Sequence, residues 1–121
     1  MAATPNHLPN TYSLCFRIMR DTTHWQRRKR LLRAVSDEAI GKFWARTTST
    51  IVMRSKREAQ DLLTTLVFKA ELDDRDRVFL VEITGQPSAR FGLDEEDVLD
   101  VLLPTHKRPS EPDTNGAGLL A

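Results

Sequence analysis

The sequence predicts an α+β domain in which helices pack on one face of an antiparallel sheet. Three stretches support this fold class. Residues 56–70 carry apolar side chains at steps of three and four, which places them on one face of a helix. Residues 11–19 alternate apolar and polar side chains, as half-buried strands do. Residues 78–84 are almost continuously apolar, which is typical of a strand with little exposed surface.

The length of the chain sets its domain organisation. A chain of 121 residues with 40% hydrophobic residues fits one globular domain with a substantial core. We expect residues 1–10, which are polar and contain proline, to form a flexible arm, and residues 11–103 to form the domain. Residues 104–121 are dominated by proline, glycine, polar and charged residues, so we expect a disordered tail there.

The first helix is expected over residues 25–39. Thr23 and Gln26 have the spacing of a capping box, in which each side chain binds the other residue's backbone N–H. Gly41 can end the helix. The expected apolar arc consists of Trp25, Leu31, Leu32, Val35 and Ala39.

A hairpin is expected between the two long helices. Residues 42–47 and 49–53 predict its two strands, because apolar side chains alternate or cluster in both. Ser55 and Glu58 then predict a capping box at the start of the helix over residues 56–70.

The last part of the domain is expected to be short and irregular. The turn at residues 85–87 ends the preceding strand, and residues 89–93 predict a short edge strand. Asp94 can cap a final helix, which Pro104 ends.

This order, β-α-β-β-α-β with a short C-terminal extension, predicts a ferredoxin-like sandwich. Two right-handed β-α-β units give a four-stranded antiparallel sheet with both helices on one face. The other face is left open for a ligand or a second copy. By alternation we expect it to carry Cys15, Arg17, Trp44, Arg46 and Glu82.

The charge is unevenly divided along the chain. Residues 1–57 contain 12 Lys or Arg and 3 Asp or Glu, whereas residues 58–121 contain 6 and 14, although the net charge is only +1. Such a division suggests an anionic ligand or self-association between the two halves. Alternatively, the two halves interleave in space and the field largely cancels.

The composition favours a cytoplasmic protein without cofactors. Cys15 is the single cysteine, so no internal disulfide can form. No apolar run approaches the roughly 20 residues that span a bilayer, and no secretory signal is recognisable. His7, His24 and His106 are scattered, so no histidine constellation or metal site is expected.

A basic surface is expected on the first helix. Phosphate oxygens could bind there with release of counterions; the alternative is an ordinary solvated helix face. The candidate nucleic-acid contacts are Arg17, Arg27, Lys29, Arg30, Arg33 and Arg46. Arg28 falls inside the expected apolar arc, so its head must reach water, a carboxylate or a partner.

Three apolar residues are candidates for a partner interface. Trp44 could stack on a base or, as we favour, lie in a dimer interface. Phe68 and Leu72 lie off the core face of their helix. They could contact another protein, although docking of the final helix is the favoured alternative.

Two segments resemble a known family. The strand at 47–53 and the turn and strand at 72–85 look like those of small ferredoxin-like proteins related to the CRISPR-associated spacer-acquisition subunit, the SinR-family, GhoS and VapD relatives. The resemblance implies a homodimer and a role in defence, mobile elements or toxin–antitoxin control. It implies binding of RNA or DNA, without a membrane.

In nuclease members of that family an aspartate in a Tyr-x-x-x-Phe-Asp pattern closes the first strand and is thought to bind a metal. The matching run begins at Tyr12 and places Arg17 where the aspartate would be. A cation there would repel magnesium, so we expect a non-catalytic nucleic-acid-binding or regulatory protein. The alternatives are a magnesium-dependent endoribonuclease using Asp21, and a protein-interaction module acting through the open sheet face.

Overall fold

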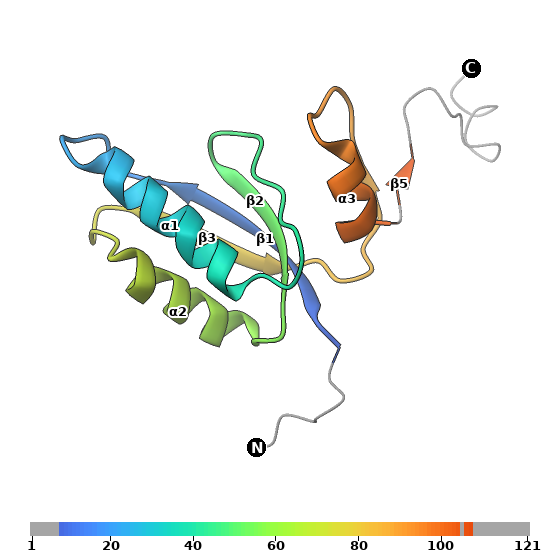
Figure 1. The fold of residues 1–121 in the computed structure, drawn as a ribbon, viewed down its shortest axis with the longest axis horizontal. Helices are drawn as coiled ribbons and strands as arrows, with labels where there is room; N and C mark the ends of the chain where they lie inside the picture. The colour runs from blue at the N-terminus through green and yellow to red at the C-terminus, as the bar shows by residue number, and fades with distance from the viewer. Residues whose placement is uncertain (1–7, 105, 108–121) are drawn as a thin grey trace, which may run out of the picture.

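The computed structural model describes residues 8–104 and 106–107. A three-stranded antiparallel sheet has the order β2 (Thr50–Ser55), β1 (Asn10–Arg17), β3 (Arg77–Glu82). The helices α1 (His24–Glu38) and α2 (Ala59–Ala70) lie side by side on one face of it (Figure 1). The chain is therefore α+β as predicted, and the predicted order of its elements is confirmed in part, since one of the expected strands is missing.

The main core lies between the sheet and these two helices. Alternation along β1 buries Tyr12, Leu14 and Phe16, and Leu62 and Leu66 supply the facing stripe of α2. The expected stripe of α2 is thus present. On α1 the buried face is displaced from the expected arc and consists of Arg27, Leu31, Ala34 and Val35.

The strand register decides which side chains lie on the other face. Glu82 pairs with Tyr12, and paired residues share a face, so Glu82 lies on the helix side and not on the open face as expected. Phe79 pairs with Cys15, and Arg77 pairs with Arg17, so these four side chains share the open face. Arg17 and Glu82 therefore lie on opposite faces of the sheet and cannot form an ion pair across it.

The predicted strand over residues 42–47 does not form. Only Trp44 makes a β-bridge, with Val52, through backbone N–H to O distances of 2.8 and 2.9 Å. Side-chain packing holds this segment in place, and a ladder of backbone hydrogen bonds does not. Phe43 packs against the main core, while Trp44 is buried on the opposite face of the sheet. The described residues therefore show three strands in this sheet, not four.

A third helix, α3 (Glu96–Leu102), covers part of the face that was expected to be open. Val98, Leu99 and Leu102 pack with Trp44 and Val52 in a second, smaller core. Because α3 lies on this side of the sheet, the favoured contact of the final helix with α2 does not form. Two short parallel strands, β4 (Ser88–Ala89) and β5 (His106–Lys107), replace the strand expected at 89–93.

The expected capping boxes are absent at both long helices. Neither N-cap residue, Thr23 or Glu58, makes a side-chain capping hydrogen bond. Ser55 Oγ instead accepts the backbone N–H of Arg57 at 3.1 Å, which delays the start of α2 until Ala59.

Candidate nucleic-acid interface

A cleft opens where the end of β1, the start of α1 and the loop before β2 meet. These segments lie at the same end of the sheet (Figure 1), and the backbone N–H of Phe16 donates to Ser49 O at 2.9 Å. The cleft has a volume of about 430 Å³. Its described lining consists of Phe16, Arg17, Ile18, Arg20, His24, Trp25, Arg28, Thr48 and Ser49.

Aromatic rings form one wall of the cleft. Trp25 is 59% exposed, and its ring centroid lies 4.6 Å from that of His24 at an interplanar angle of 39°. Trp25 was expected in the core, but Arg27 is the buried residue of this turn. Since two residues along a helix are about 200° apart, burial of Arg27 turns Trp25 outward.

Three arginines supply the charge of the cleft. Arg28 lies over the Phe16 ring, with its Cζ 5.9 Å from the ring centroid, which fixes the guanidinium at the wall. The side chains of Arg17 and Arg20 have no hydrogen-bond or ion-pair partner within the described residues. No acidic side chain occurs in the described lining. The cleft is therefore a concentrated positive site beside an exposed indole.

His24 adds an unsatisfied polar atom at the same place. Its Nδ1 lies 2.9 Å from the carbonyl oxygen of Asp21, an acceptor, so Nδ1 carries the proton. Its Nε2 is buried and has no hydrogen-bond partner among the described residues. A buried nitrogen without a partner costs free energy, which a ligand or water at the cleft wall could recover.

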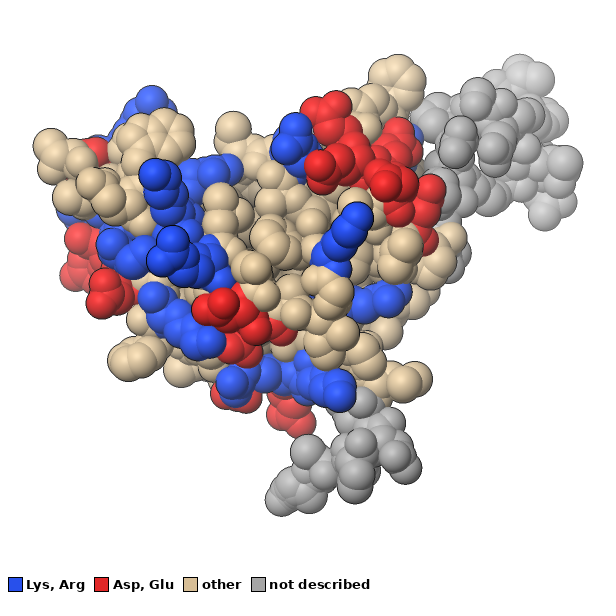
Figure 2. All heavy atoms as spheres, in the orientation of Figure 1, with Lys and Arg blue, Asp and Glu red and all other residues tan. Residues whose placement is uncertain are grey.

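The charge asymmetry of the sequence persists on the surface. Figure 2 shows Lys and Arg atoms gathered over α1, and Asp and Glu atoms gathered over α3 on the other side of the same face. The separation is partial, because ion pairs such as Arg30–Glu71 and Glu38–Lys69 join the two halves of the chain between α1 and α2. A polyanion would be attracted to the α1 side.

A buried arginine, Arg27, connects the segments that lie behind the cleft. Arg27 is 4% exposed, and its Nε donates to Asp76 Oδ2 at 2.9 Å. Its Nη1 and Nη2 donate to the two carboxylate oxygens of Asp21, each at 3.1 Å. Nη1 also donates to Thr23 Oγ1 at 2.5 Å, and Nη2 to Met19 O at 2.8 Å. These hydrogen bonds and ion pairs compensate the free-energy cost of burying the guanidinium charge.

This arrangement corrects the expected role of Arg27 as a phosphate contact. Its guanidinium faces two carboxylates inside the protein, because the turn at residues 73–76 brings Asp76 against the start of α1. The backbone N–H of Met19 also donates to Asp76 Oδ1 at 2.7 Å. The cluster therefore fixes the segment that carries Arg20 and orients the first turn of α1.

Asp21, the candidate catalytic residue, belongs to the same cluster. Besides Arg27 it binds Arg75, whose Nη2 lies 3.0 Å from Asp21 Oδ2. Within the described ranges, no group of three or more His, Cys, Asp or Glu side chains could hold a metal ion. The position of Asp21 indicates a structural role.

The ion pairs of Asp21 and Glu38 predict loss of stability in acid. Hydrogen bonds from Arg27 and from Thr23 lower the pKa of Asp21 from 3.8 to about 2. Lys69, together with Arg57, lowers the pKa of Glu38. Both pKa values are depressed by folding, so the stabilisation is complete above the ordinary pKa and is lost as the pH falls through the folded one.

We expect the melting temperature to fall between about pH 4 and pH 2. Thermal unfolding followed by circular dichroism across this range measures the effect, with Asp21→Asn as the comparison. The variant should be less stable at pH 6 and should show a shallower decline in acid. If the melting temperatures of the wild-type protein and the variant fell in parallel, the ion pairs of Asp21 would not be the cause of the acid instability.

The remaining predicted contacts on α1 have separate places. Lys29 and Arg33 are exposed, without partners in the part of the chain that the structure describes. Arg30 donates from Nε to Ala70 O at 2.7 Å and from Nη2 to Glu71 O at 3.2 Å. It therefore caps the C-terminus of α2, where Glu71 adopts a left-handed conformation with φ of 52°.

The residues predicted in loops or at interfaces are dispersed. Arg46 is exposed in the loop before β2, near but not in the described lining of the cleft. Phe68 is 82% exposed on α2, whereas Leu72 packs against the main core. Trp44 is 3% exposed, and its Nε1 donates to Asp94 O at 2.7 Å, so it faces α3 and not a partner.

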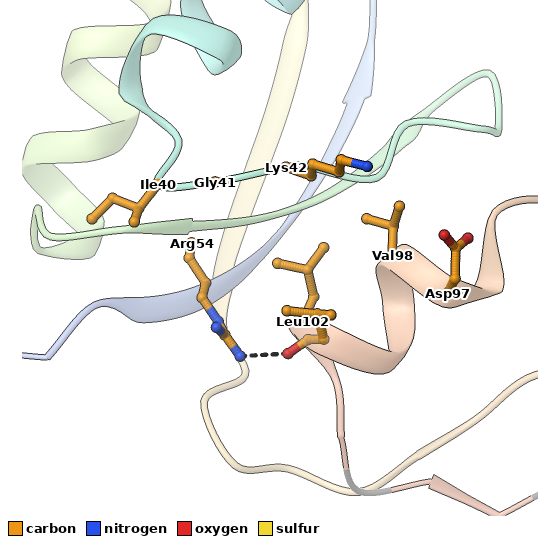
Figure 3. Close-up of a pocket in the computed structure, with 8 residues that line it drawn as sticks. Ile40, Gly41, Lys42, Arg54, Asp97, Val98 and Leu102 are labelled. Carbon is orange, nitrogen blue, oxygen red and sulfur yellow. Dashed lines mark hydrogen bonds between the residues drawn. The ribbon is translucent and has the colours of Figure 1, made fainter.

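A second pocket, of about 420 Å³, lies between residues 40–42 and α3 (Figure 3). Its walls include apolar side chains such as Val98 and Leu102, and Asp97 stands at its rim. Arg54, its nearest guanidinium, is already engaged, since Nη2 donates to Val101 O at 2.5 Å. The described lining carries two cations, Lys42 and Arg54, and one carboxylate, Asp97, so its positive charge is smaller than that of the cleft with its three arginines.

Comparisons with protein-family models, curated proteins and solved structures gave no match. None of the helices within residues 8–104 and 106–107 has the length and apolar character needed to span a bilayer.

Proposed function

We propose that the protein binds nucleic acid in the cleft, without cleaving it. The observation that supports this function is the convergence of Arg17, Arg20 and Arg28 on an exposed Trp25, with no acidic side chain in the described lining. Guanidinium groups bind phosphate oxygens, and an exposed indole stacks on bases of any sequence. Exposed Thr48 and Ser49 add hydroxyl donors to the lining of the cleft.

The architecture supports a ferredoxin-like fold in which one of the four strands is reduced to the single β-bridge at Trp44. The bridge at Trp44 lies on the outer side of β2, where the fourth strand of that fold would pair. We propose a homodimer as well, since β3 is the edge of the sheet within the described residues. A regulatory role in defence, mobile elements or toxin–antitoxin control rests on the family resemblance, and a cytoplasmic location on the single cysteine, Cys15.

The variant Arg20→Ala/Arg28→Ala tests the proposed function. Binding of a fluorescein-labelled oligodeoxythymidylate is measured by anisotropy across a salt series. Each lost phosphate contact on a single strand lowers the slope of log K against log[salt] by about 0.7, so we expect a decrease of about 1.4. Affinity near physiological salt should fall roughly tenfold or more.

The matched control is Lys42→Ala/Lys56→Ala. It removes the same charge from two exposed lysines, and Lys56 follows Ser55, which pairs with Asn10 at the other end of the sheet. We expect a smaller loss of affinity and nearly the wild-type slope. Equal slopes for the two double variants would show that net charge, not the cleft, determines binding.

A further inference from the structure

We propose that the bound strand continues from the cleft across the open face of β1 and β3, so that the ligand is single-stranded. This inference rests on the proposed function and extends the same site. The track is defined by two positions in addition to the cleft, Arg77 and Phe79. The first phosphates lie in the cleft, and a later base stacks on Phe79.

The cleft and the open face are continuous at the end of β1. A shallow depression of about 420 Å³ on the open face has a described lining of Cys15, Phe16, Arg17, Arg77, Val78 and Phe79. Phe16 and Arg17 also line the cleft. Arg17 therefore stands between the two hollows and can contact a backbone that passes from one to the other.

Phe79 provides an apolar platform on the sheet. It is 65% exposed, an unusual state for a phenylalanine on the central part of a strand, and pairs with the exposed Cys15. Val81 on the same face is 38% exposed. A ring that lies on a sheet face can stack a base, provided that the base is not already stacked inside a duplex.

The charge of this face favours a polyanion over an apolar partner. Arg17 and Arg77 pair directly across β1 and β3, and like charges in that position destabilise a sheet. Arg77 is held in place, since its Nη1 donates to Asp74 O and Asp76 O at 3.0 Å each. A phosphate between the two guanidinium groups would relieve their repulsion.

A duplex fits this track poorly. Its bases are stacked on one another, so they cannot stack at once on Trp25 beside α1 and on Phe79 on the sheet. The path also bends around the end of β1, from the cleft to the open face. A flexible single strand can follow that bend, whereas a duplex of this length is stiff.

Cys15 gives a direct test, because it is the single cysteine of the chain and lies beside Phe79. Its alkylation rate with N-ethylmaleimide is measured with and without saturating oligodeoxythymidylate of about 12 nucleotides. We expect the oligonucleotide to slow alkylation roughly tenfold or more. A hairpin duplex at the same concentration should protect Cys15 much less.

The outcomes separate this inference from the proposed function. If the oligonucleotide binds in a salt-dependent manner but leaves the alkylation rate unchanged, the proposed track across the sheet is wrong, while binding in the cleft is still supported. If no oligonucleotide binds, both proposals are wrong. Slower alkylation at higher protein concentration without nucleic acid would instead show that a second copy covers this face, and would overturn the track.

The variant Phe79→Ala supplies an independent measurement. Its side chain is largely exposed, so the fold should be unaffected. We expect affinity for the oligonucleotide to fall between about 5-fold and 100-fold, with the salt slope unchanged. The control is Phe68→Ala, which removes an 82% exposed phenylalanine from α2. Equal affinities for the two variants would overturn the assignment of Phe79.

Discussion

Replacement of Asp76 by alanine is expected to lower the free energy of unfolding by about 3–5 kcal/mol, the cost of removing one partner from a buried ion pair. The Asp76 side chain is 1% exposed. Its carboxylate accepts hydrogen bonds from Arg27 and from the backbone N–H groups of Met19 and Asp73. Without it, the Arg27 guanidinium stays buried with part of its charge uncompensated.

The control for this prediction is Asp74→Ala. Asp74 lies in the same turn but is exposed, so its replacement should change stability by no more than about 0.5 kcal/mol. Urea unfolding of both variants measures the difference. If Asp76→Ala unfolds at the same urea concentration as Asp74→Ala, the cluster does not hold the start of α1 in place.

Replacement of Trp25 by alanine is expected to weaken binding of single-stranded nucleic acid about 5- to 150-fold. Stacking of a base on an aromatic side chain contributes about 1–3 kcal/mol. The indole carries no charge, so the slope of log K against log[salt] should stay at its wild-type value. This pattern is the opposite of that expected for the arginine variant, which flattens the slope.

Stability provides the internal control for Trp25→Ala. Trp25 is 59% exposed and contacts His24, so its loss should leave the melting temperature almost unchanged. Anisotropy titrations with wild-type protein and Phe68→Ala give the reference affinities. A melting temperature lowered by more than roughly 10 °C would show that Trp25 packs in the fold and that its effect on binding is indirect.

Much of the fold could be predicted because its signals are local. The stripe of α2 and the alternation of β1 depend on side chains a few residues apart, and both agree with the structure. The segment 42–47 has a similar local pattern, yet Trp44 alone pairs with β2. The conformation of residues 42–47 depends on α3, which follows some fifty residues later and buries Trp44 from the other side.

The site was less predictable, because an ion cluster distant in sequence determines it. Arg27 looked like a surface cation within a basic run, but Asp76, 49 residues away, draws it into the interior. That burial rotates α1 so that Trp25 leaves the expected core and faces the cleft. The sequence did contain one indication of a buried arginine, because arginines interrupt the apolar arc of the first helix. That pattern singled out Arg28, whereas the arginine that is buried is Arg27.

The most direct test of nucleic-acid binding in the cleft is the emission of Trp25 during titration with an oligodeoxythymidylate. The chain has two tryptophans, and Trp44 is buried beneath α3, so only Trp25 can be reached by a ligand. We expect saturable quenching that disappears in Trp25→Phe. Binding seen by anisotropy without any change in Trp25 emission would contradict the account.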